Sequence, residues 1–346
     1  MTDSIKIKQT DISTLGEFGL IDQLTKGFVL QRQTTIKGVG DDAAVIDVGS
    51  KVILVSTDLL VEGIHFDMMY TPLKHLGYKA IIVNLSDIIA MNALPEQVTV
   101  SIAVSSKYSV EALEELYKGI KLACEIYQVD LVGGDTTSSP RGMTISVTAI
   151  GSAAKQDIVY RSGARVGDLI CVTGNLGAAY LGLQLLEREK AVFMEHPESK
   201  PDLENNPYQL ERFLKPEARK DAVNYFKNQG FKPTAMIDVS DGLASEILHI
   251  CKQSKTGALI EEAKVPIHST TEQLAINFRL DPITCALSGG EDYELLFTVD
   301  PCHLTKVRLM PDVYIIGEIK PPHEGVKLLS TGGNLHTLTA QGWVHF

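Results

Sequence analysis

Apolar and polar residues in the first part of the chain alternate with the periods of strands and helices. Behind Pro72, apolar residues recur at the spacing of an amphipathic helix, and Ser109 is placed to cap a second helix that we expect to end near Tyr127. Short apolar or alternating runs, typical of strands, occupy residues 51–56, 98–104 and 143–152. These elements predict one α/β or α+β layer.

The same kind of pattern restarts after a polar stretch at residues 153–165, where we place a domain boundary. We therefore expect an N-terminal domain over residues 1–153 and a C-terminal domain over residues 154–346. Charged residues and prolines between Glu187 and Asn206 interrupt any period and indicate an irregular surface segment. The second layer is predicted to contain strands at 168–173, 235–239 and 293–299, with helices at 177–186 and 243–254.

Chain length and charge limit the kinds of partner. A chain of 346 residues is long enough for two cores of ordinary size. The formal net charge of -11 argues against nucleic acid and anionic membranes, which are bound through clustered lysines and arginines. An acidic protein can still bind a small phosphorylated substrate when metal ions neutralise the charge between carboxylates and phosphates.

The spacing of the cysteines and the lack of long apolar runs predict a cytoplasmic protein. The five cysteines lie far apart with no Cys-x-x-Cys pair, which fits reduced thiols better than a disulfide framework or a zinc site. Residues 1–20 contain no signal-like apolar region, and no stretch is long and apolar enough to span a bilayer.

Aspartates gather in four short polar segments that we interpret as turns. Glycines there let the backbone approach phosphate oxygens, and carboxylates are the hard oxygen ligands that Mg²⁺ prefers. One such turn is more often structural than functional, but several that converged without cations would repel one another. The segments are 38–42, 56–58, 133–137 and 238–242.

Asp87 is a carboxylate within an apolar helix, where it shares a face with Asn84. Its apolar neighbours at 81–85 and 88–90 would bury an unpaired carboxylate at high cost, so we interpret it as a metal ligand rather than as part of a solvated face. No P-loop, protein-kinase or dinucleotide fingerprint occurs in the chain. The sequence therefore predicts an ATP-using enzyme that holds the triphosphate through carboxylate-bound Mg²⁺.

An ordered series of short motifs extends over nearly the whole chain. It comprises residues 17–21, 38–43, 56–58, 62–66, 84–87, 133–137, 161–164, 237–242 and 288–295. In this order the motifs resemble the thiamine-monophosphate kinase family. The segments 61–66 and 288–295 separate that family from others of the same fold.

The resemblance implies the two-domain fold of the aminoimidazole ribonucleotide synthetases, with an N-terminal α/β domain that forms a homodimer and a C-terminal α+β domain. It implies direct in-line transfer of the ATP γ-phosphoryl group to thiamine monophosphate, without a phospho-enzyme. The products would be thiamine diphosphate and ADP, in the last step of thiamine diphosphate biosynthesis.

The resemblance also implies roles for single residues. Those that would position the reactants and neutralise charge are Asp42, Asp58, Asp135 and Arg161, with no general base assigned. The expected ATP contacts are Gly134, Asp135, Arg161, Ser240 and Tyr127. The expected contacts on the thiamine side are His65, Glu291 and Trp343. The expected magnesium ligands are Asp42, Ser56, Thr57, Asp58, Asp87, Asp135, Asp238 and Asp241.

Simpler interpretations stay open for some of these residues. His65 could be a surface histidine, Arg161 could only solvate the linker, and Trp343 could only pack the C-terminus. Leu59 and Lys215 depart from the family pattern without touching a proposed ligand. The rival functions are another ATP-dependent synthetase of this fold and a non-catalytic binder of nucleotide or thiamine phosphate. A selenophosphate synthetase would need a reactive cysteine near the N-terminus, where this sequence has none.

Overall fold

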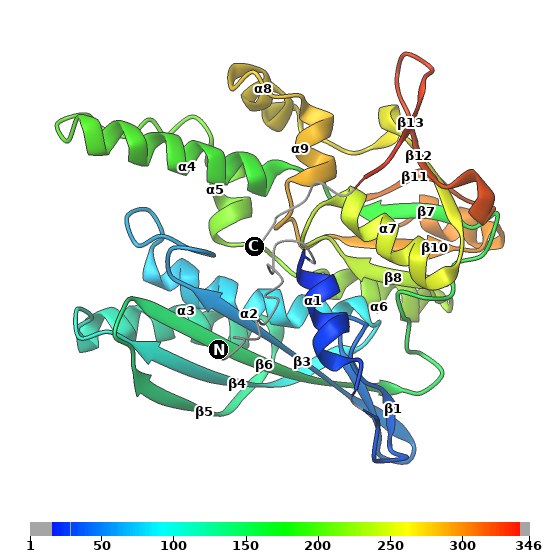
Figure 1. Cartoon of the computed structure of the whole chain (residues 1–346), viewed down its shortest axis with the longest axis horizontal. Coiled ribbons are helices and arrows are strands. Elements are labelled where there is room, and N and C mark those ends of the chain that lie inside the picture. Colours follow the sequence, from blue (N-terminus) through cyan, green and yellow to red (C-terminus); the bar gives the residue numbers. More distant parts are fainter. Residues whose placement is uncertain (1–15, 28, 340–346) are drawn as a thin grey trace, which may run out of the picture.

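Two β-sheets with their helices make up residues 16–27 and 29–339, the part of the chain that the structure, a computed structural model, describes (Figure 1). The first sheet has six strands in the order β1-β2-β3-β6-β4-β5, and the second has seven in the order β13-β12-β9-β11-β7-β10-β8. Each sheet takes its strands from one half of the sequence, which confirms the two expected layers. The domain boundary between residues 153 and 154 stays a prediction.

The elements of the first half are α1 (Gly16–Thr25), β1 (Thr35–Lys37), β2 (Ala44–Asp47), β3 (Lys51–Val61), α2 (Leu73–Ala90), β4 (Leu94–Val104), α3 (Val110–Tyr127), β5 (Asp130–Ser138) and β6 (Met143–Ala154). Ser109 caps α3 as predicted, because its side-chain oxygen accepts the backbone N–H of Ala112 at 3.2 Å. Helices α2 and α3 cover one face of the sheet, and no helix among the described residues covers the other (Figure 1).

Two of the four aspartate segments are not turns. Residues 56–58 lie inside β3, which pairs with β6 along its whole length, from Lys51 opposite Ala154 to Val61 opposite Thr144. Residues 133–137 lie inside β5, which is parallel to β4. The hydrogen-bonded ladder with a neighbouring strand has therefore overridden the local preference of Gly and Asp for turns.

The elements of the second half are β7 (Leu169–Thr173), α4 (Ala178–Glu195), α5 (Pro207–Leu214), α6 (Lys220–Gln229), β8 (Ala235–Asp238), α7 (Leu243–Ser254), β9 (Gly257–Glu261), α8 (Ser269–Asn277), α9 (Pro282–Ser288), β10 (Leu295–Val299), α10 (Leu304–Arg308), β11 (Val313–Lys320), β12 (Val326–Leu329) and β13 (Leu335–Thr337). The predicted strands at β7, β8 and β10 and the predicted helix at α7 are confirmed.

Helix α4 continues well beyond its predicted end, so the expectation of an irregular segment from Glu187 is wrong for its first part. The buried side chain of Glu189 accepts the backbone N–H of Asp202 at 2.8 Å. Leu203 packs beside Leu186 in the same apolar cluster. The chain after the helix thus folds back onto it. These tertiary contacts stabilise a helical segment that its charged sequence does not predict.

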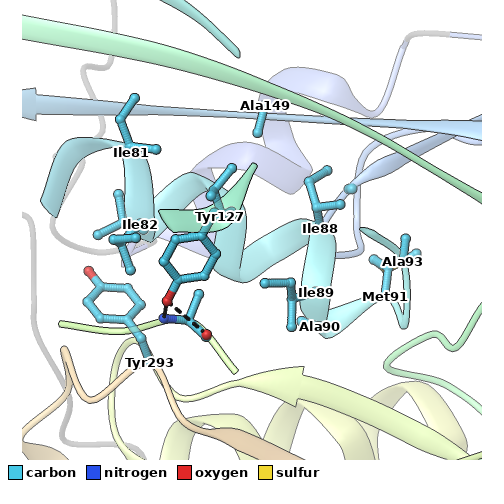
Figure 2. Close-up of a cluster of buried hydrophobic side chains, with 14 of the residues drawn as sticks. Ile81, Ile82, Ile88, Ile89, Ala90, Met91, Ala93, Tyr127, Ala149 and Tyr293 are labelled. Carbon is cyan, nitrogen blue, oxygen red and sulfur yellow. Dashed lines mark hydrogen bonds between the residues drawn. The ribbon is translucent and has the colours of Figure 1, made fainter. Parts of the chain in front are cut away.

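Helix α2 is buried between the two halves of the molecule. It contacts β3 and β6 of the first sheet and also β8 of the second. Figure 2 shows its isoleucines in one buried cluster with Ala149, Tyr127 and Tyr293, which come from both halves. Two charged residues of this helix, Lys79 and Asp87, are thereby held at the junction of the halves.

The structure gives the state of the cysteines and the length of the helices. All five cysteines are free thiols, so the expectation of unpaired cysteines is confirmed. Among the helices of residues 16–27 and 29–339, none has both the length and the apolar character needed to cross a bilayer.

Candidate active site

A cavity of about 970 Å³ lies between the two halves of the molecule. Strand β3 and helix α2 line it from the first half, while β8, α7 and the segment before β10 line it from the second. Many of the residues selected from the sequence meet here, namely Thr57, Asp58, His65, Asp87, Arg161, Asp238, Ser240, Asp241 and Glu291.

Three aspartates form what we call the acidic centre of this region. Asp42 lies in the loop between β1 and β2, Asp87 on α2, and Asp238 at the end of β8. Each offers a carboxylate oxygen, and these oxygens all lie within 4.8 Å of one another. Serine hydroxyls orient two of them, because Ser56 donates to Asp87 at 2.5 Å and Ser86 donates to Asp238 at 2.6 Å.

Burial raises the pKa of all three carboxyl groups of the acidic centre. Mainly through desolvation, the pKa of Asp42 is raised to about 7 and that of Asp238 to about 6. The pKa of Asp87 is raised well above its ordinary value, first by burial and then by the charges of Asp58 and Asp238. In addition, Oδ2 of Asp42 is buried without a hydrogen-bond partner among the described residues. Hard oxygen donors held this close, one of them unused, fit a divalent cation such as Mg²⁺.

Residues 56–58 are consecutive in β3, and their side chains make different contacts. The side chain of Ser56 already serves Asp87, and the hydroxyl of Thr57 donates to the carbonyl oxygen of Val147 at 2.9 Å. Asp58 lines the cavity, and its backbone N–H donates to the side-chain oxygen of Asn84 at 3.0 Å. Direct ligation of a metal by Ser56 or Thr57 stays a prediction.

Arg161 closes one side of the acidic centre. Its Nε donates to Oδ1 of Asp42 at 3.0 Å, and its Nη2 donates to the same oxygen. The side chain is 15% exposed, so the interpretation of Arg161 as a solvated linker residue is wrong.

Burial, together with the charges of Arg161 and Lys252, lowers the pKa of nearby His249 to about 4. This imidazole is therefore neutral near pH 7.

His65 and Glu291, the residues expected on the thiamine side, both line the cavity. The Nδ1 atom of His65 accepts the backbone N–H of Val61 at 3.0 Å. In the neutral imidazole the hydrogen must then lie on Nε2, which makes that atom a donor. The carboxylate of Glu291 is held by Lys79, whose Nζ lies 3.1 Å from Oε1.

Another part of the cavity wall contains a network that the sequence did not reveal. The hydroxyl of Tyr70 donates to Glu187 at 2.6 Å, and Lys190 donates to Asp67 at 2.8 Å and to Glu187 at 3.3 Å. These bonds tie the loop that carries His65 to helix α4. The only signal in the sequence was the spacing of Glu187 and Lys190, which share a helix face at i,i+3.

Several expected contacts lie outside this cavity. Tyr127 is 5% exposed and does not line the cavity. Its hydroxyl oxygen accepts the backbone N–H of Ala218 and lies 2.8 Å from Glu217 and 3.0 Å from the carbonyl oxygen of Ala218, to either of which it can donate (Figure 2). A contact of Tyr127 with ATP stays a prediction. Gly134 and Asp135 lie on β5, three strands from β3 and thus about 14 Å away at about 4.8 Å per strand. Neither residue lines the cavity of its own chain, and metal ligation by Asp135 stays a prediction. The stretch that contains Trp343 lies outside the described residues.

Two families of AIR synthase related proteins match the chain. The family of their N-terminal domain matches residues 40–153, and the family of their C-terminal domain matches residues 165–328. The two sheets and the acid-lined cavity between them thus belong to a protein of the AIR synthase related class.

Full-length relatives narrow this class. The thiamine-monophosphate kinase of Aquifex aeolicus (strain VF5) is 35% identical over 340 residues, which cover 97% of this chain and 99% of that protein. The thiamine-monophosphate kinase of Bacillus subtilis (strain 168) is 33% identical over 338 residues, which cover 96% of this chain and 100% of that protein. The solved structure of AaThiL complexed with AMPPCP and TMP superposes with a TM-score of 0.82 at 34% identity, over 98% of this chain and 99% of that one. The chain belongs to the thiamine-monophosphate kinase family.

Proposed function

We propose that this chain is a kinase that transfers the γ-phosphoryl group of ATP to thiamine monophosphate, giving thiamine diphosphate and ADP. The observation that carries the proposal is the cluster of Asp42, Asp87 and Asp238 beside the cavity that His65 and Glu291 also line. The names of the full-length relatives, and the complex of AaThiL with AMPPCP and TMP, support this pair of substrates.

Magnesium is the metal that we propose for the acidic centre. Asp42, Asp87 and Asp238 would hold it, with Asp58 beside them and Asp241 as a further ligand from the turn after β8. Bound Mg²⁺ would neutralise charge between the triphosphate and the acceptor phosphate. The raised pKa values of the cluster support this choice, because a divalent cation offsets both the burial, which is the main cause, and the mutual repulsion that disfavour ionisation of the three carboxyl groups.

The residues around the acidic centre orient the two phosphates. Arg161 binds Asp42 through one side of its guanidinium, and we propose that its remaining N–H groups contact the triphosphate. The acceptor phosphate is already largely ionised at pH 7, so transfer needs no general base. Positioning and charge neutralisation then supply most of the rate of a direct in-line transfer.

A homodimer is part of the proposal, because Gly134 and Asp135 lie away from the cavity of their own chain. Strand β5 is an edge strand whose residues are all exposed, including Leu131 at 45% and Val132 at 57%. Exposed edge strands with apolar side chains are surfaces that pair with another chain. We propose that β5 of one protomer brings Asp135 to the cavity of its partner.

Two further parts of the proposal rest on the sequence. Free thiols at all five cysteines suit a reducing compartment, and we place the reaction in the cytoplasm. We place the boundary between the two domains at residues 153 and 154, at the end of β6, which closes the first sheet along the chain.

A product assay tests the proposed function. The protein is incubated with thiamine monophosphate, ATP and MgCl₂, and the thiamine species are oxidised to fluorescent thiochromes and separated by chromatography. We expect thiamine diphosphate to appear, and to be absent when EDTA replaces MgCl₂ or when unphosphorylated thiamine replaces thiamine monophosphate. A folded protein that forms no thiamine diphosphate under the complete conditions would overturn the proposal.

A further inference from the structure

Lys79 is a buried lysine in the middle of helix α2. It is 4% exposed, and lysines are almost never this buried unless they are paired. Its Nζ lies 3.1 Å from both carboxylate oxygens of Glu291 and 3.0 Å from the carbonyl oxygen of Phe213. It also lies 4.0 Å from the centre of the Phe213 ring. The ammonium group is thus surrounded by acceptors and an aromatic face.

These contacts use the donors of Lys79 and leave acceptor positions on Glu291. An ammonium group has three N–H donors, which match the two carboxylate oxygens and the carbonyl oxygen that surround it. Each carboxylate oxygen can accept more than one hydrogen bond, so Glu291 keeps capacity for a ligand. Its side chain is 30% exposed and lines the cavity, whereas Lys79 does not line it. Lys79 can therefore act on a ligand only through the residues that it contacts, and of these Glu291 is the one with a charged group in the cavity.

The backbone of Glu291 is fixed independently of its side chain. Glu291 has a φ of 58°, in the left-handed region that costs free energy for a residue other than glycine. Its N–H donates to the carbonyl oxygen of Ser240 at 2.7 Å. At the preceding Gly290 a Cβ would lie 2.4 Å from the same carbonyl oxygen. This turn is thus locked to the turn that follows Asp238, and the bond to Lys79 fixes the direction of the carboxylate.

Helix α2 also sets the distance between the two ends of the cavity. Lys79, Val83 and Asp87 are spaced by four residues and share one face of the helix, and Val83 and Asp87 line the cavity. At about 1.5 Å per residue, Lys79 and Asp87 are separated by about 12 Å along the helix axis. One rigid element therefore holds both Asp87, in the acidic centre, and Lys79, the partner of Glu291.

We propose that Lys79 is a positioning residue that fixes the carboxylate of Glu291 for the acceptor substrate. This inference rests on the proposed function, which makes thiamine monophosphate the acceptor. The acceptor carries a cationic thiazolium ring and an aminopyrimidine N–H group, and a carboxylate with free lone pairs attracts both kinds of group. With Glu291 fixed, the phosphate at the other end of the molecule is directed toward the acidic centre.

The test compares Lys79→Met with a matched control, Lys215→Met. Lys215 also pairs with a glutamate, Glu217, at 3.2 Å and lies 4.8 Å from the ring centre of Tyr78, but it does not line the cavity. We expect Lys79→Met to raise the KM for thiamine monophosphate by about tenfold to a hundredfold, the range for a lost contact to a charged group. The KM for ATP should change less than about twofold. The control should leave both constants unchanged.

A double-mutant cycle with Glu291→Gln separates positioning from a purely structural role. If Lys79 acts through Glu291, then adding Lys79→Met to Glu291→Gln should raise the KM for thiamine monophosphate no further. Additive effects, an equal rise in both KM values, or an unchanged KM in Lys79→Met would each overturn the inference. Should Lys79→Met fail to fold, Lys79→Gln takes its place in the cycle, with the same outcomes applied. Wild-type protein that makes no thiamine diphosphate would instead overturn the proposed function.

Discussion

At the scale of single residues, the acidic centre is a set of carboxyl groups whose ionisation is opposed by burial. The pKa values of Asp42 and Asp238 are raised to about 7 and about 6, mainly by desolvation. A carboxyl group whose pKa is higher in the folded than in the unfolded protein makes the folded state less stable once the pH exceeds its ordinary pKa. A bound cation reverses this effect, so stability and metal binding are linked at this site.

Asp87→Asn should separate these two effects. We expect kcat/KM to fall by about a hundredfold or more, because a charged ligand of the proposed Mg²⁺ is lost. The metal-free variant should melt at the same temperature as the wild type or a few degrees higher, since a buried charge has been removed. The rise in melting temperature that MgCl₂ gives the wild type should be reduced. These quantities are measured by the thiochrome assay and by thermal unfolding with and without MgCl₂.

Asp157→Asn is the matched control for this prediction, because Asp157 is an exposed aspartate in a turn outside the cavity. It should leave activity and the MgCl₂ effect unchanged. An Asp87→Asn variant that keeps near-normal kcat/KM would show that Asp87 has no role in the active site.

At the scale of elements, the N-terminus of helix α4 is capped from a distant turn. The carboxylate of Asp292 accepts the backbone N–H of Gly177 at 2.7 Å and that of Ala179 at 3.4 Å, and Arg212 lies 4.0 Å from it. A negative charge at this end also interacts favourably with the helix dipole. The first two turns of α4 carry Tyr180 and other residues that line the cavity. The cap thus links stability to the shape of the site.

Asp292→Ala should lower the free energy of unfolding by about 1–3 kcal/mol, since two buried N–H groups lose their acceptor. Ser109→Ala removes an exposed cap from α3, where water can replace the lost bond, and should cost about 0.5–1 kcal/mol. Urea unfolding of both variants measures the difference. An equal loss in the two variants would contradict the importance assigned to the buried cap.

The elements that the sequence predicted well are those whose apolar period is set locally. Helices α2, α3 and α7 have this property. The limits predicted for α3 and α7 agree closely with the structure, and α2 begins directly after Pro72 as predicted. Strand β5 was misread as a turn, because Gly and Asp prefer turns and its pairing with β4 is a tertiary contact. Gly134 is required there for another reason, since a Cβ would lie 1.8 Å from the carbonyl oxygen of Val100.

The sequence predicted those parts of the site that can be recognised from a single residue and its neighbours along the chain. Asp87 was found because a carboxylate in an apolar helix needs a partner. The same reasoning applies to Lys79 in the same helix, but its partner Glu291 is 212 positions away and only the fold brings them together. The network of Tyr70 and Glu187 depends on the unexpected length of α4, and the i,i+3 spacing of Glu187 and Lys190 could not by itself indicate the partner Tyr70, 117 positions away.

At the scale of the whole molecule, each active site of the proposed dimer contains residues from both chains. Asp58 would serve the cavity of its own chain, whereas Asp135 on the exposed strand β5 would serve that of the partner. A symmetric dimer would then contain two such shared sites. Substitutions at these two positions should therefore complement each other between chains.

Co-expression of Asp58→Ala and Asp135→Ala chains tests this arrangement. Each variant alone should form inactive homodimers. In a mixed dimer, one cavity would combine an intact Asp58 with an intact Asp135 from the partner, so random pairing of equal amounts should restore about a quarter of the wild-type activity. Mixed dimers without activity, although both chains associate, would show that Asp135 does not act on the partner's cavity.

The most direct measurement of the central claim is ³¹P NMR of one reaction that contains the protein, thiamine monophosphate, ATP and MgCl₂. The account predicts that the phosphorus signals of thiamine diphosphate and ADP grow together in equal amounts, with no matching growth of inorganic phosphate. A synthetase that activates an oxygen and then displaces it would release inorganic phosphate with ADP. Growth of inorganic phosphate and ADP without thiamine diphosphate would contradict the account.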